Sequence, residues 1–64
     1  MNNSQISIEF LNLRRRLEFI KGILQQTSPM LDEGYQEIFA DLKYAIEHDQ
    51  EQIDSIREAL KEEQ

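Results

Sequence analysis

Apolar residues in the first 24 positions recur at spacings of four, three, four, three and four, and this regularity constrains the fold more than any other feature. At 100° per residue the series falls within an arc of about 80°, which is one face of an α-helix. A second series of similar character follows after position 30. The two series are Ile6, Phe10, Leu13, Leu17, Ile20, Leu24 and Leu31, Tyr35, Ile38, Leu42, Ile46, Ile53, Ile56, Leu60. Two amphipathic helices are therefore predicted.

One turn cluster separates the two series. Ser28 can cap a helix in which Pro29 takes the first position, where its missing N–H costs nothing. Asp32 is an alternative cap. The fold predicted is an all-α, coiled-coil-like antiparallel two-helix hairpin, a single domain over residues 1–64 with helix 1 at about 5–26, a turn at 27–29 and helix 2 at about 30–62.

The chain is short for a fold with its own core. Domains of about 60 residues bury only about 60% of the surface that the unfolded chain exposes. Small folds usually compensate with disulfides, a metal or oligomerisation. The 64 residues contain no cysteine and one histidine, which argues against a disulfide or a zinc site. We therefore expect no cofactor, and we expect a homodimer that forms a four-helix bundle.

The expected hairpin leaves part of helix 2 without a partner. With the turn at 27–29, residues whose numbers add to about 56 face each other. Helix 2 then continues for about 12 residues, or about 18 Å, beyond helix 1. Ile53, Ile56 and Leu60 lie on this overhang. We expect them to pack against a second copy of the chain or against another protein.

Helix 1 also carries apolar residues on the face opposite its main stripe. Ile8, Phe19 and Ile23 project away from the stripe, and Phe19 and Ile23 are one turn apart. A helix that only formed a hairpin would not need them. We expect this patch in the dimer interface; binding of a different partner and simple exposure are the alternatives.

Charge is unevenly distributed along the chain. The net charge is −6, made up of +2 over residues 1–27 and −8 over residues 28–64. We expect the two halves to attract each other, with Arg14, Arg15 and Arg16 close to Glu37 and Asp41. Recognition of an acidic partner or of RNA is the alternative for the arginines, and the acidic total argues against nucleic-acid binding.

Two acidic features complete the candidates. Asp49 interrupts the second apolar stripe. It either stays wet at the end of helix 1 or pairs with an arginine of a second chain. The acidic run over residues 47–63 is expected to be a solvated helix face. Mimicry of a nucleic acid that blocks a basic groove is the alternative.

The sequence contains no catalytic triad or phosphate-binding loop, so we expect no enzyme activity. It also contains no apolar run near the 20 residues of a membrane span and no signal-peptide pattern, and we expect a cytoplasmic protein without a membrane contact. The leading hypothesis is a small homodimeric interaction module that regulates or inhibits a protein partner by helix packing. The alternatives are an RNA-binding hairpin dimer and an acidic nucleic-acid mimic of the phage or mobile-element type.

Overall fold

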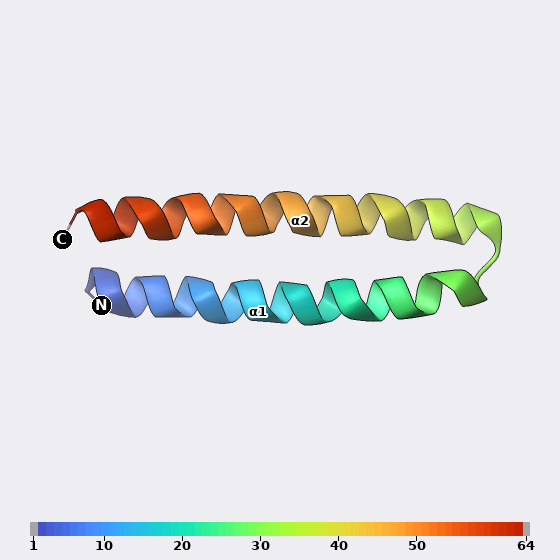
Figure 1. Cartoon of the computed structure of the whole chain (residues 1–64), viewed down its shortest axis with the longest axis horizontal. Helices are drawn as coiled ribbons and strands as arrows, with labels where there is room; N and C mark the ends of the chain where they lie inside the picture. Colours follow the sequence, from blue (N-terminus) through green and yellow to red (C-terminus); the bar gives the residue numbers. More distant parts are fainter. Residues whose placement is uncertain (1, 64) are drawn as a thin grey trace.

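The computed structural model describes residues 2–63 and contains two long helices side by side (Figure 1). Helix α1 spans Asn3–Thr27, a short 3-10 helix η1 spans Ser28–Met30, and helix α2 spans Glu33–Glu62. The hairpin measures 48 × 14 × 12 Å. The prediction of an all-helical chain with two helices packed against each other is confirmed.

Helix α1 begins earlier than the apolar stripe suggested. The Asn2 side chain accepts a hydrogen bond from the Gln5 backbone N–H at 2.9 Å, and the Gln5 side chain accepts one from the Asn2 N–H at 3.1 Å. This reciprocal capping box satisfies two N–H groups that a helix start otherwise leaves without partners. The first turn of α1 therefore forms before its first large apolar residue.

The turn is longer than predicted. The Ser28 N–H still bonds to the Leu24 carbonyl, so the chain keeps its direction beyond α1. Pro29 lies in η1, which adds about one turn to α1 instead of opening α2. The chain reverses at Leu31, and Asp32 is the N-cap of α2. Of the two helix starts considered, the structure has the later one.

The register corrects the predicted overhang. The Arg57 Nε donates to the Ser7 carbonyl at 3.2 Å, and the Gln50 Nε2 donates to the Arg14 carbonyl at 3.4 Å. Level residues therefore have numbers that add to about 64 instead of 56. The start of α1 is level with Leu60, whose carbonyl accepts a hydrogen bond from the Asn3 side chain at 3.3 Å. The prediction of an unpartnered overhang is wrong, because the η1 turn moves the point of reversal to Leu31 and Asp32.

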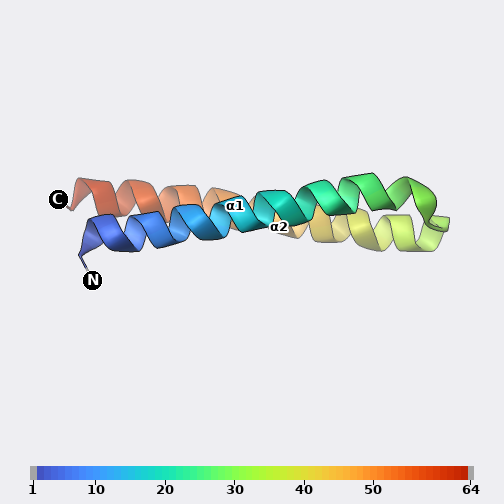
Figure 2. The ribbon, with the colours of Figure 1, turned by 90° about the horizontal axis from the view of Figure 1, so that it is seen from below.

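The helices cross at a shallow angle near the middle of the hairpin (Figure 2). The surface between them is here called the seam. Its residues recur at spacings of three and four on both helices, and apolar residues alternate with polar ones. Apolar members of the seam are Phe10, Leu17 and Leu24 on α1 and Phe39, Ile46, Ile53 and Leu60 on α2. Polar members are Ser7, Arg14 and Lys21 on α1 and Lys43, Gln50 and Arg57 on α2. All thirteen are buried or half-buried.

The core of the hairpin is minimal. Among the residues described, Ile53 is the only buried apolar side chain, at 4% exposure, and Gln50 is the only buried polar one, also at 4%. Interior residues of larger folds touch many neighbours on all sides. A pair of helices can cover only the strip where they meet. The rest of each apolar stripe therefore lies on the surface.

Candidate functional site

One side of the hairpin gathers apolar side chains from both helices. In an antiparallel pair, positions just beside the seam on one side of α1 share a face with the equivalent positions of α2. These side chains form the apolar flank, and each is between 38% and 57% exposed. The apolar flank consists of Leu13, Ile20 and Ile23 from α1 and of Tyr35, Ile38, Leu42 and Ile56 from α2.

The apolar flank exists because each predicted stripe is wider than the seam. On α1, Leu17 faces α2 and is half-buried, whereas Leu13 and Ile20 turn outward. On α2, Ile46 faces α1 and Leu42 turns to the same side as Leu13. A two-stranded coiled coil needs only a narrow seam, whereas a helix with two neighbours needs a stripe of about three positions in seven. Each stripe is therefore wider than contact with one neighbouring helix requires.

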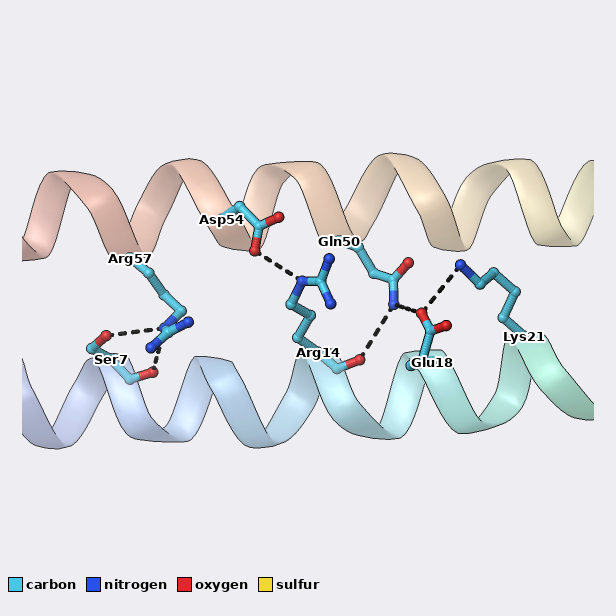
Figure 3. Close-up of polar contacts among 7 residues, drawn as sticks. All are labelled: Ser7, Arg14, Glu18, Lys21, Gln50, Asp54 and Arg57. Atoms are coloured by element: carbon cyan, nitrogen blue, oxygen red, sulfur yellow. Dashed lines mark hydrogen bonds and ion pairs between the residues drawn. The ribbon is translucent and has the colours of Figure 1, made fainter.

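The seam itself is held by polar side chains that lie between the middle of the hairpin and the chain ends (Figure 3). The Arg14 Nε donates to Asp54 Oδ1 at 2.9 Å, and the Gln50 Nε2 donates to Glu18 Oε2 at 2.8 Å. The Arg57 Nε donates to Ser7 Oγ at 3.1 Å as well as to its carbonyl. These bonds join residues 32 to 50 positions apart, so they fix the register of the two helices.

The pKa of Glu18 lies below its ordinary value because of its neighbours. The hydrogen bond from Gln50 lowers the pKa of Glu18, and the hydrogen bond from Lys21 lowers it further. The Lys21 Nζ lies 3.1 Å from Glu18 Oε2, while the Glu18 side chain stays 56% exposed. This partly wet carboxylate acts as an acceptor for the seam, and its environment does not resemble that of a catalytic acid.

The three consecutive arginines separate in the structure. Arg14 pairs with Asp54 across the seam, so the expected proximity to Glu37 and Asp41 is wrong because of the shifted register. Arg15 and Arg16 are exposed and line a shallow depression with Phe19 and Ile20. The side chains fan out along and around the helix and form no compact anion clamp.

The predicted patch on the back of helix 1 is also divided. Phe19, at 71% exposure, and Ile23, at 47%, lie one turn apart. Ile8 is eleven residues away from Phe19, about 17 Å along the helix. It lines a groove beside the seam with Ser7 and Arg57. The structure thus joins Phe19 and Ile23 and separates Ile8 from them.

The remaining predicted site residues lie on α2. Ile53 is buried against α1 and Leu60 is half-buried, whereas Ile56 is 38% exposed on the apolar flank. Asp49 is exposed in the same row as Ile56 and Leu42. The expectation that Asp49 lies at the end of helix 1 is wrong. The register places it level with Arg15, in the middle of the hairpin, among apolar neighbours on the flank.

The opposite side of the hairpin, here called the polar flank, carries two open grooves between the helices. One, near the turn, has a volume of about 480 Å³ and is lined partly by Ser28, Gln36 and Lys43. The other, near the chain ends, has a volume of about 510 Å³ and is lined partly by Ser7 and Arg57. Within residues 2–63 no three His, Cys, Asp or Glu side chains gather as metal ligands. No helix in that range is both long and apolar enough to cross a membrane.

Sequence reasoning missed Gln50, which is the most buried polar side chain among the described residues. A signal for it was present. Polar residues recur every seven positions on both helices, at Ser7, Arg14 and Lys21 and at Lys43, Gln50 and Arg57. A polar row of this kind indicates the seam only together with the apolar row three positions further on, because exposed heptad positions are polar as well.

Comparisons with known proteins add no relative. No protein-family model, no curated protein and no solved structure matches the chain.

Proposed function

We propose that this chain is a non-enzymatic interaction module that works as a homodimer and regulates or inhibits a protein partner by helix packing. The observation that carries the proposal is the uncovered apolar surface. Eleven large apolar side chains within residues 2–63 are at least 38% exposed, and one is buried. A fold this lean gains most of its stability when another surface covers those side chains.

The area of the accessible surface also supports association. The hairpin exposes 5037 Å². A compact protein of 7.6 kDa exposes about 4,300 Å². The difference of about 700 Å² is close to the roughly 800 Å² that each partner buries in an interface of standard size. The apolar flank is the surface on which such an area is available.

Phe19 supports a second contact outside the dimer. It is 71% exposed, lies outside the seam and borders the apolar flank at Ile20. Aromatic side chains are enriched among residues that dominate protein interfaces. A dimer would present two copies of Phe19 on its outer surface. This side chain is therefore the proposed anchor for the regulated protein, which would be blocked sterically where the helix packs on it.

Light scattering after size-exclusion chromatography tests the homodimer. The chain should elute with twice its mass of 7.6 kDa. Leu42→Asp, on the apolar flank, should shift the mass to that of one chain because it places a charge in the interface. The matched control is Tyr44→Asp, outside the flank at 77% exposure, which should leave the dimer mass unchanged. A wild-type chain that has the mass of one copy and full helicity at high concentration would defeat the proposal.

Crosslinking in the native host tests the partner contact. Phe19→Ser should lose the crosslinked protein and keep the dimer mass. The control is Ile8→Ser, which changes another exposed apolar residue of the same helix. If both variants retain the same crosslinked protein, Phe19 is not the anchor. If the captured material disappears after nuclease treatment, the chain acts on nucleic acid instead.

A further inference from the structure

We propose that the two copies pack face to face through the apolar flank with both turns at the same end, and that Arg16 of each copy pairs with Asp49 of the other. This inference rests on the proposed homodimer and specifies its geometry. It names a function for Asp49, the one acidic side chain in the apolar row of α2 that contains Leu42 and Ile56.

Two arrangements bring a flat flank onto a copy of itself by a two-fold axis. In the turn-to-turn arrangement the axis runs along the hairpin, and α1 of one copy lies on α2 of the other at the same level. In the turn-to-tail arrangement the axis runs across the hairpin. Helix α1 then lies on α1 of the second copy and α2 on α2, with the turn of one copy level with the chain ends of the other. The charges and the apolar residues of the flank distinguish these two arrangements.

The charges favour turn-to-turn packing. Because level residues have numbers that add to about 64, Arg16 of α1 lies within one residue of the level of Asp49 of α2. Both side chains are exposed, and the ion pairs found among residues 2–63 include neither of them. Turn-to-turn packing brings the Arg16 guanidinium over the Asp49 carboxylate of the second copy, twice in the dimer. Turn-to-tail packing brings Asp49 opposite Asp49 of the second copy and Arg16 opposite Arg16 of the second copy, because both lie near the middle of the hairpin. Like charges placed directly opposite each other disfavour that arrangement.

The apolar residues favour the same arrangement. Exposed apolar side chains are concentrated near the turn, where Ile20 and Ile23 of α1 lie within two or three residues of the level of Leu42 and Ile38 of α2. Turn-to-turn packing lays these four on the same four of the second copy. Turn-to-tail packing would place Ile23 level with Glu9 of the second copy. The arrangement that matches charge therefore also matches apolar with apolar.

Electron-spin distance measurements test the geometry directly. The described residues contain no cysteine, so single labels can be introduced at Met30→Cys beside the turn and at Glu62→Cys beside the chain ends. Turn-to-turn packing should give a Met30–Met30 distance within about 30 Å, which is the width of a four-helix bundle with its labels. A mixture of the two labelled chains should give a cross distance of about 40 Å or more. A short cross distance with a long Met30–Met30 distance would overturn the proposed geometry.

Charge exchange tests the pair. Arg16→Asp and Asp49→Arg should each raise the dimer dissociation constant about tenfold, because each variant places two like-charged pairs in the interface. The double exchange should return the constant to within about threefold of wild type. Arg15→Asp and Glu51→Arg make the same charge changes at neighbouring exposed positions off the flank and should leave the constant unchanged. Circular dichroism of each variant confirms that the helices are intact.

The outcomes separate the two proposals. A single-chain mass with no intermolecular distance would refute the homodimer and this geometry with it. A dimer mass with the reversed distances, or a double exchange that fails to recover, would refute the geometry alone.

Discussion

The two halves of the hairpin use the same pair of helices in different ways. The terminal half, residues 2–18 and 47–63, contains the buried pair Gln50 and Ile53. It also contains every side-chain hydrogen bond found between α1 and α2 in the described residues. The turn half, residues 19–46, contains eight of the eleven exposed large apolar side chains. In the terminal half, polar side-chain hydrogen bonds join the two helices. The turn half instead exposes most of the large apolar side chains.

The difference separates the part of the chain that sets the register from the part that exposes most of the large apolar side chains. Polar side chains bond only in one alignment, so those of the terminal half select the register of α1 against α2. Apolar contact is nondirectional and roughly proportional to area, so the turn half is suited to bind a further surface. Four predictions test this division, in order of decreasing expected effect.

Ile53→Ala should have the largest effect on folding. Ile53 is the only buried apolar side chain in the described part of the chain, and truncation of such a side chain costs about 2–4 kcal/mol. Denaturant unfolding at fixed concentration should therefore show a lower midpoint. Ile8→Ala is the control. It makes the same truncation at a side chain that is 55% exposed, and it should change the free energy of unfolding by less than about 0.5 kcal/mol. Equal losses for both variants would contradict a closed terminal half.

Gln50→Ala should have the next largest effect. The substitution removes the donor to Glu18 and to the Arg14 carbonyl and leaves a gap in the seam. The expected loss is about 1–2 kcal/mol in the free energy of unfolding. Gln52→Ala, an exposed neighbour on α2, controls for helix propensity and should be close to neutral. A neutral Gln50→Ala would show that the polar seam does not hold the terminal half together.

Asp54→Asn should weaken the pair with Arg14 more modestly. The two side chains are 53% and 37% exposed, so solvent screens their attraction, and the expected loss is about 0.2–1 kcal/mol. The difference from wild type should shrink when unfolding is repeated in 1 M salt, because the Debye length then falls to about 3 Å. A loss that does not change with salt would mean that the charge is not its cause.

The pH dependence of Glu18 should be the smallest effect. Its pKa is lowered in the folded chain, chiefly by the Gln50 hydrogen bond, so its stabilisation is present above the ordinary glutamate pKa. The contribution is lost as pH falls from about 5 through the folded pKa. Thermal unfolding of wild type and Glu18→Gln should therefore differ at pH 7 and converge at acidic pH. In the Gln50→Ala background that difference should be reduced, and an unchanged difference would assign the lowered pKa to another cause.

The register shows where sequence reasoning stopped. Apolar spacing gave both helices, because periodicity is a property of each segment alone. It did not give the alignment, which depends on whether Pro29 ends the first helix or opens the second. Both placements satisfy the local preferences of proline. Only the packed turn, with η1 continuing from α1 and Asp32 capping α2, distinguishes them, and this shift of the reversal point removed the expected overhang.

Sequence reasoning identified only part of the candidate site, for the same reason. Phe19, Ile23 and Ile56 are exposed in the structure, as an apolar residue outside a narrow seam must be. Ile53 had seemed unpartnered because the assumed alignment placed it beyond helix 1. The distinction between buried and exposed members of one stripe depends on rotation of each helix about its axis. Such rotation is set by both helices together.

Local spacing along the chain specifies two amphipathic helices, joined by a short turn, with stripes wider than one helix pair can cover. Packing of the two helices against each other specifies which part of each stripe faces inward. Side-chain periodicity is local, and a single helix defines it. The choice of seam is collective, because Gln50, Arg14 and Arg57 reach their partners in only one alignment. That alignment turns the seven side chains of the apolar flank to a common side.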